Sequence, residues 1–374
     1  MGAERFSPAK CPRLIVKIGS ALLVDQAGEV RRAWLESVVA DIATRHAAGQ
    51  KIAVVSSGAI ALGARRLKLP KGGRASLEDA QAAAATGQIA LSHCWAELLG
   101  DRGLTAAQML VTLDDLEDRR RYLNASSTLD RLLNLGVVPV INENDSVATE
   151  EIRFGDNDRL AARIGQAADA RGVILLSDID GLYTANPHRH SSAKLVPEVM
   201  RIDARIRAMA DAESASGMGS GGMTSKLEAA RIAQASGVHL AIISGKRDHP
   251  LAAFDRDGRG TVFVGGKIGS ARKAWLGGRL TAKGRIAVDG GAVTALATGR
   301  SLLAAGATAV EGKFVRGDVI DIVAPDGHVI ARGLAEYDAA DASAIVGKRR
   351  DALEAILGYA PRGALVHRDH MVLL

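Results

Sequence analysis

The chain has 374 residues, of which 47% are hydrophobic, and carries 48 Lys and Arg against 42 Asp and Glu. It can bury a large core and exceeds one typical domain, so two domains are expected. Its only cysteines, Cys11 and Cys94, exclude a disulfide framework and a cysteine-based zinc site. From residue 282 onward the chain has eleven Lys and Arg and eleven Asp and Glu, so the whole excess of basic residues lies before residue 282. Small anionic ligands suit this distribution at least as well as nucleic acid.

No apolar run reaches the length of a membrane span, and the first ten residues lack the apolar core of a signal peptide. We therefore expect a cytoplasmic protein without a membrane partner. The most apolar stretch, residues 80–99, is broken by polar residues and predicts a buried helix.

Short β-branched runs alternate with helical patterns over the first 250 residues. Near-continuous apolar strands between helices predict an α/β fold of three layers, with a mainly parallel sheet and helices on both faces. The predicted strands cover residues 13–20, 51–58, 137–145, 172–178 and 238–245, and the predicted helices cover 33–46, a segment from 157 and a segment after 226.

Four of these strands finish in polar or glycine turns. The turns are Gly19-Ser20, Ser56-Ser57-Gly58, the run from Asn142 to Asp145, and Ser177-Asp178. Ligands of parallel sheets bind beyond the carboxyl ends of the strands. The four turns therefore predict one shared site.

Residues 216–226, SGMGSGGMTSK, form a glycine-rich stretch before a helical pattern. The order of Thr224, Ser225 and Lys226 excludes a Walker A loop. Glycines before a helix can still direct backbone N–H groups at an anion, so the stretch is either a phosphate-binding loop or a flexible surface loop. Ser225 and Glu228 are spaced as a capping box, which predicts that the helix starts at Ser225.

Two lysines are candidate catalytic residues. Lys17 lies in a predicted core strand and either reaches water at the strand end or points to the shared site, while Lys226 follows the glycines. Two cations without a catalytic histidine pattern favour phosphoryl transfer to an acceptor that needs no deprotonation, such as a carboxylate.

The acidic segment from residue 142 to 160 is either a solvated loop or a site for a substrate ammonium group or the waters of Mg²⁺. The histidine pairs His188 with His190 and His367 with His370 lack a matching acidic partner, so structural or surface roles are favoured over metal sites.

The sequence changes character after residue 258. We predict a first domain over 10–258, a Gly-rich linker over 259–280 and a small β-rich domain over 281–374. Turn signals at Asp289-Gly290-Gly291 and Asp326-Gly327 support the third segment.

The motifs together resemble the glutamate-phosphorylating branch of the amino-acid kinase family, and the second domain resembles a PUA domain. The matching segments, in chain order, are IVKIGSALL, VVSSGAIALG, PVINENDSV, FGDNDRLAARIG, LLSDIDGLYTANP, GSGGMTSKLEAA and AILGYAPRGALVHRDHM. They span nearly the whole chain. Ser20 and Ser56 stand where the family often has Thr, and the order of Thr224 and Ser225 is often reversed.

The resemblance implies phosphorylation of the L-glutamate side chain by ATP with Mg²⁺, as the first step of proline synthesis. It implies that Lys17 and Lys226 neutralise charge on the transferring phosphoryl group and that Asp158 holds both lysines. It further implies that glutamate is bound by Ser57, Asp145 and Asn157, and that ATP is bound by Lys17, Ser177, Asp178, Gly221, Gly222, Met223, Thr224, Ser225 and Lys226; no residue is assigned as a direct metal ligand.

We also expect inhibition by L-proline, a homo-oligomer and an association with glutamyl phosphate reductase. Two alternatives remain open at this point. One is a kinase of another small carboxylate, carbamate or nucleotide on the same fold. The other is an RNA-binding PUA protein, which the zero net charge after residue 281 and the few aromatic residues there, Phe314, Tyr337 and Tyr359, disfavour.

Overall fold

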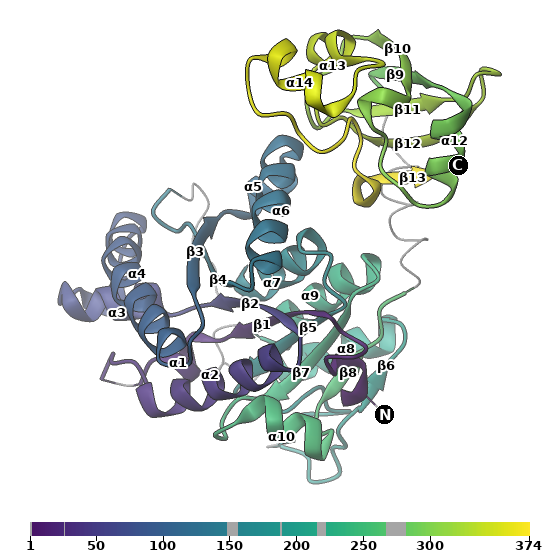
Figure 1. Ribbon diagram of the computed structural model, residues 1–374. Coiled ribbons are helices and arrows are strands. Elements are labelled where there is room, and N and C mark those ends of the chain that lie inside the picture. Colours follow the sequence, from purple (N-terminus) through teal and green to yellow (C-terminus); the bar gives the residue numbers. More distant parts are fainter. Residues whose placement is uncertain (1, 26, 148–155, 188, 215–221, 267–281) are drawn as a thin grey trace. The chain divides into compact units, whose positions relative to one another are not determined.

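The computed structural model describes residues 2–25, 27–147, 156–187, 189–214, 222–266 and 282–374 (Figure 1). The chain is divided into two compact units, Met1–Gly266 and Lys267–Leu374. Among the described helices, none has the length and apolar character that crossing a bilayer requires.

The first unit is built on one eight-stranded sheet. Parallel pairing joins the neighbours from β3 through β7, whereas β8 runs antiparallel to β7. The sheet order is β3 (Ala106–Val111), β4 (Val138–Glu143), β2 (Lys51–Ser56), β1 (Arg13–Ile18), β5 (Gly172–Ser177), β7 (His239–Ser244), β8 (Thr261–Phe263) and β6 (Glu198–Val199). The predicted mainly parallel sheet is confirmed, and so are its five predicted strands.

Strands β3, β6 and β8 were not predicted from the sequence. Strand β3 is an edge strand with five of its six residues at least partly exposed, so it lacks the continuous apolar run of a central strand. Strands β6 and β8 have only two and three residues. The predicted linker from residue 259 is wrong at its start, because Thr261–Phe263 pairs within the first sheet. Residues 267–280 of that linker lie outside the described part of the chain.

Helices cover both faces of this sheet (Figure 1). One face carries α2 (Arg32–Ala47), α4 (Leu77–Gly100) and α10 (Pro250–Asp257), and the other carries α6 (Arg119–Asn134), α7 (Asp156–Ala167) and α9 (Met223–Ala235). The shorter helices are η1 (Ala3–Phe6), α1 (Ser20–Leu23), α3 (Ala59–Arg66), η2 (Pro70–Gly73), α5 (Leu113–Glu117) and α8 (Ala204–Ser214).

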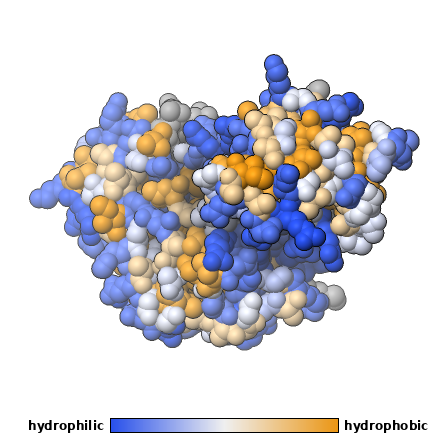
Figure 2. Space-filling model, turned by 45° about the horizontal axis from the view of Figure 1, so that its top comes forward, coloured by the Kyte–Doolittle hydropathy of each residue, from blue (hydrophilic) through white to orange (hydrophobic). Residues whose placement is uncertain are grey.

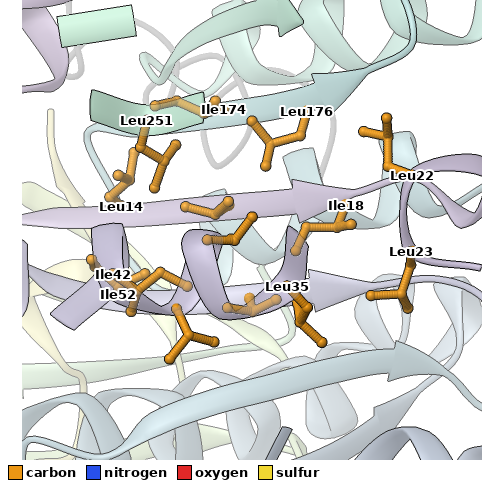
Figure 3. Close-up of a cluster of buried hydrophobic side chains, with 14 of the residues drawn as sticks. Leu14, Ile18, Leu22, Leu23, Leu35, Ile42, Ile52, Ile174, Leu176 and Leu251 are labelled. Carbon is orange, nitrogen blue, oxygen red and sulfur yellow. The ribbon is translucent and has the colours of Figure 1, made fainter. Parts of the chain in front are cut away.

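Alternation along β1 divides the core between the two faces. Leu14, Val16 and Ile18 belong to the cluster beneath α2, part of which is drawn in Figure 3. Ile15 belongs to the cluster beneath α7 and α9. Because successive side chains of a strand point to opposite faces, Lys17 lies on the same face as Ile15.

The second unit contains a five-stranded sheet and its own apolar core. Its order is β10 (Ala307–Gly312), β9 (Gly284–Val288), β11 (Val319–Val323), β12 (Val329–Leu334) and β13 (Met371–Leu373), and its helices are α12 (Gly290–Ala297), η3 (Ala304–Gly306), α13 (Ala339–Ile345), α14 (Arg350–Leu357) and η4 (Arg368–His370).

One of the two predicted turns in this unit is wrong. Asp289 does not begin a turn between strands but caps helix α12, and its carboxylate accepts a hydrogen bond from the Ala292 amide. An aspartate before a short run of small residues serves a helix start as well as a turn. The second turn is confirmed, because Gly327 lies between β11 and β12 with a φ of +86°.

Helices α3 and α4 cross in very close contact at two glycines. A Cβ atom added to Gly63 would lie 1.7 Å from the carbonyl oxygen of Ala83, and one added to Gly87 would lie 1.8 Å from that of Ala59. Both obstacles are backbone atoms, so no side-chain rotation relieves the overlap. The crossing therefore requires glycine at both positions, whatever their backbone torsion angles.

We expect Gly87→Ala to destabilise the protein by about 3 kcal/mol or more, because the new methyl group must separate two packed helices. Gly100→Ala is the matched control, since Gly100 ends the same helix and an added Cβ would meet nothing within 4 Å. Urea unfolding of both variants measures the effect. Equal midpoints for the two variants would contradict the close crossing.

Candidate functional site

The carboxyl ends of the parallel strands bring the predicted polar turns to one edge of the first sheet. Ile18, the last residue of β1, pairs with Ser56 on one side and with Leu176 on the other. Ser177 at the end of β5 pairs with Ser244 at the end of β7. The turns that follow these strands therefore lie next to one another, as the sequence analysis predicted.

Two lysine ammonium groups flank one carboxylate at this edge. Lys17 Nζ lies 2.5 Å from Asp158 Oδ1, and Lys226 Nζ lies 3.2 Å from Asp158 Oδ2. All three side chains are at least nine-tenths buried. The two charges are therefore held in fixed positions beneath the edge of the sheet.

Three separate elements supply these side chains. Lys17 extends from β1, Asp158 from the first turn of α7 and Lys226 from the first residues of α9. Helices α7 and α9 pack against each other on the face that carries Lys17. Alternation in β1 and the pairing of the two helices thus bring together residues that are far apart in sequence.

The environment of Asp158 keeps its carboxyl group ionised. Burial alone would raise the pKa of Asp158, but the charges of Lys17 and Lys226 outweigh burial and hold that pKa below its ordinary value. Since both carboxylate oxygens face an ammonium group, Asp158 is poorly placed to abstract a proton or to bind a metal ion.

A second polar pair lies next to this cluster. Asn157, the neighbour of Asp158 in α7, donates a hydrogen bond from Nδ2 to Ser57 Oγ at 2.8 Å. Asn157 Oδ1 is buried and has no hydrogen-bond partner among the residues that the structure describes. A buried oxygen in this state is an acceptor ready for a ligand's N–H group.

Asp145 lies in the turn after β4 and is buried. The charge of Asp145 acts on Arg74, a residue that the sequence analysis missed. Burial lowers the pKa of Arg74, and Asp145 partly opposes that shift. Arg74 follows the turn of η2, and no pattern in the sequence connects it with residue 145.

Buried side chains of α4 form hydrogen bonds with residues at the ends of two strands. Trp95 donates from Nε1 to Ser56 Oγ at 3.1 Å, and Asn142 donates from Nδ2 to Gln88 Oε1 at 2.6 Å. Asn142 Oδ1 in turn accepts a hydrogen bond from the Glu143 amide. These bonds fix the turns after β2 and β4, and the sequence shows them only as polar interruptions of an apolar helix.

The predicted capping box at Ser225 is wrong. Helix α9 starts at Met223, its N-cap is Gly222, and no side chain caps it. Ser225 is therefore the third helical residue and not the cap. Residues 216–221 of the predicted phosphate loop, Gly221 among them, lie outside the described residues.

The remaining predicted nucleotide residues lie at the same edge. Thr224 is exposed and Ser225 is partly exposed in the first turn of α9, and Met223 is buried. At the end of β5, Ser177 Oγ donates to Asp178 Oδ1 at 3.0 Å. Strand β5 is next to β1, so this pair adjoins the strand that carries Lys17.

No group of three or more His, Cys, Asp or Glu side chains suited to a metal ion occurs among the described residues. The rings of His367 and His370 lie 5.8 Å apart in the second unit, where His370 contacts Glu336. His188 lies outside the described part of the chain.

The first unit and the second unit each match a known protein family. A sequence model described as "Amino acid kinase family" matches residues 12–244, and one described as "PUA domain" matches residues 284–357. The chain belongs to the amino acid kinase family. It is an ATP-dependent kinase with a C-terminal PUA domain.

Several curated relatives of this kinase resemble it along their whole length. The protein named "Glutamate 5-kinase" of Sphingopyxis alaskensis is 72% identical, with 99% of each chain covered. Those of the same name from Zymomonas mobilis and Novosphingobium aromaticivorans are 65% and 60% identical; the matches cover 99% and 100% of this chain and 93% and 98% of the relatives.

Among solved structures, a carbamate kinase from Giardia lamblia bound to AMP-PNP aligns with a TM-score of 0.49 and 14% identity. The alignment covers 68% of this chain and 98% of that one.

Asp158→Asn should destabilise the kinase by about 3 kcal/mol or more at neutral pH, because two buried ammonium groups lose their counter-charge. The pKa of Asp158 is lower in the folded protein than its ordinary value. The ionised carboxylate therefore stabilises the fold at pH values above the ordinary pKa of a carboxyl group, and this stabilisation is lost as the pH falls through the folded-state pKa. The variant should therefore lose less stability than the wild type on acidification to about pH 3.

Denaturant unfolding at neutral and acidic pH tests both statements. Asp130→Asn is the control, since Asp130 is half exposed and pairs with Arg13 at the opposite edge of the sheet. Parallel stability curves for the wild type and Asp158→Asn across this pH range would show that the charge of Asp158 does not stabilise the fold.

Proposed function

We propose that the kinase transfers the γ-phosphoryl group of ATP to the side-chain carboxylate of L-glutamate and forms L-glutamyl 5-phosphate. A carboxylate oxygen attacks the γ-phosphorus, the bond to the β-phosphate oxygen breaks, and ADP leaves. The full-length relatives with the name glutamate 5-kinase support this substrate. The structural observation that most strongly supports phosphoryl transfer is the cluster of Lys17, Asp158 and Lys226 at the carboxyl edge of the sheet.

In this proposal, Lys17 and Lys226 stabilise the charge of the transferring phosphoryl group. Phosphoryl transfer depends mostly on positioning and on fixed charges next to the equatorial and leaving oxygens. Two ammonium groups anchored to one buried carboxylate meet that need without rearrangement during the reaction. The acceptor carboxylate is ionised at neutral pH, so the site needs no general base.

Ser57, Asn157 and Asp145 form the proposed glutamate site. The unpaired Oδ1 of Asn157 can accept a hydrogen bond from the ammonium group of the amino acid. Asp145 supplies a negative charge for the same ammonium group, and Arg74, on which that charge acts, supplies a positive charge for a substrate carboxylate. The Ser57 hydroxyl is held in place by Asn157.

The proposed ATP site comprises Lys17, Ser177, Asp178 and the segment from Gly221 to Lys226. The start of α9 after Gly222 supports this assignment, since the positive end of a helix dipole suits a phosphate group. Mg²⁺ would enter as a complex with the phosphates of ATP, which is its usual mode of binding.

Further parts of the proposal concern the cellular role. We place the reaction at the first step of proline synthesis, in the cytoplasm, with inhibition by proline, self-association into a homo-oligomer and glutamyl phosphate reductase as a partner. If proline binds at the glutamate site, saturating glutamate should restore full turnover. Inhibition that glutamate cannot overcome would place proline elsewhere.

Incubation with ATP, Mg²⁺, glutamate and hydroxylamine tests the reaction, because hydroxylamine traps an acyl phosphate as a hydroxamate. We expect glutamate-dependent hydroxamate and ADP in equal amounts. Aspartate, carbamate and UMP serve as alternative acceptors. ADP release with one of them, and none with glutamate, would assign the chain to another kinase reaction.

Lys226→Ala should reduce kcat by about a hundredfold or more and leave the KM for glutamate nearly unchanged, because a fixed cation acts chiefly on the transition state. Lys51→Ala is the control, since Lys51 begins β2 at the opposite edge of the sheet. A kcat equal to that of the control would remove Lys226 from the mechanism.

Asp145→Asn should raise the KM for glutamate by about tenfold or more, because the ammonium group loses a charge-assisted hydrogen bond. The KM for ATP should change little. Steady-state kinetics with each substrate varied in turn measures both values. Weaker ATP binding with unaltered glutamate saturation would show that Asp145 does not bind glutamate.

A further inference from the structure

The second unit contains a pocket that the proposed kinase reaction does not use. The pocket has a volume of about 110 Å³. Its walls come from three segments, residues 303–305, 345–353 and 362–365, with Tyr337 between them. The apolar part includes the buried side chains of Tyr337, Ile345, Leu353 and Leu365.

Backbone hydrogen bonds hold these walls together. The Gly347 amide donates to Ala304 O at 2.9 Å, which ties the second segment to the first. The Leu365 amide donates to Leu302 O at 2.7 Å, which ties the third segment to the first. The Tyr337 hydroxyl accepts a hydrogen bond from the Arg362 amide and donates one to Arg362 O. The pocket is therefore formed before any ligand binds.

Three cationic side chains, Lys348, Arg350 and Arg362, line the pocket, and none of its lining residues is acidic. Within the part of the chain that the structure describes, no carboxylate lies within salt-bridge distance of these three. By contrast, Arg285 and Arg332 of the same unit are paired with acidic residues at 2.6 and 2.7 Å.

Two carboxylates of the second unit already have other partners. Glu336 contacts His370 and Arg316, and Asp341 accepts a hydrogen bond from the Tyr359 hydroxyl. These three cations therefore have no ion-pair partner among the described residues, while the interior of the pocket is apolar.

We propose that this pocket binds a small organic anion, in which a compact apolar group enters the cavity and a phosphate or carboxylate faces Lys348, Arg350 and Arg362. A sealed apolar cavity of about 150 Å³ holds benzene, so a smaller pocket with an open rim suits a single small ring or a short branched chain. Guanidinium groups bind phosphate and carboxylate oxygens in pairs of hydrogen bonds.

Phenyl phosphate is the probe for this proposal, with isothermal titration calorimetry on the full chain as the measurement. Inorganic phosphate carries the charge alone and phenol carries the ring alone. We expect phenyl phosphate to bind at least about tenfold more tightly than either, because only it fills both parts of the pocket. Benzoate then distinguishes a carboxylate ligand from a phosphate ligand.

Arg362→Gln should weaken the binding of phenyl phosphate by about tenfold or more, since it removes a charge-assisted contact. Its side chain is exposed, so the variant should fold. Arg300→Gln is the matched control, because Arg300 is an exposed arginine of the same unit that does not line the pocket. Comparison of the two variants also separates this pocket from any phosphate site in the first unit.

Three results would overturn the proposal. The first is the absence of binding heat with phenyl phosphate and benzoate in the millimolar range. The second is equal affinity of Arg362→Gln and Arg300→Gln for the probe. The third is an Arg362-dependent complex with a single-stranded RNA oligonucleotide that displaces phenyl phosphate at much lower concentration, which would assign the pocket to nucleic acid instead.

Discussion

The candidate site of the first unit depends on one carboxylate between two buried ammonium groups. Without Asp158, Lys17 and Lys226 would be two like charges of low exposure that repel each other and lack solvation. With it, the three groups carry a single net positive charge in a fixed geometry. A fixed positive charge at the carboxyl edge of a parallel sheet attracts a polyphosphate and needs no rearrangement to stabilise a developing negative charge.

The rest of the first unit keeps these three residues in place. The sheet positions Lys17, and the packing of α7 on α9 positions Asp158 and Lys226. On the opposite face, the glycine crossing packs α3 closely on α4, whose Trp95 and Gln88 bond to the ends of β2 and β4. The backbone that surrounds the proposed substrates thus rests on rigid elements.

The two units show opposite arrangements of charge. In the first unit, the central cations share a buried carboxylate and the polar residues converge on a sheet edge. In the second unit, the cations of the pocket are exposed and surround an apolar interior. The face drawn in Figure 2 shows hydrophilic side chains interspersed with apolar areas.

The sequence by itself determined the features that depend on neighbouring residues. Continuous apolar runs such as that of β1 predicted the central strands, and the polar turns after them predicted the shared edge, because both signals are local. Lys17 and Lys226 were singled out by a strand end and a helix start. The role assigned to Asp158 came instead from the family resemblance, since no local pattern distinguishes it from Asp156.

Only the tertiary structure decided the features that join distant segments. The effect of the Asp145 charge on Arg74, the bonds from α4 to the strand ends and the unpaired Oδ1 of Asn157 have no sequence signal. The start of α9 at Met223 and the helix after Asp289 also differ from the local predictions. Capping residues fit turns and helices equally well, and strands as short as β6 and β8 exist only because neighbouring strands supply their hydrogen bonds.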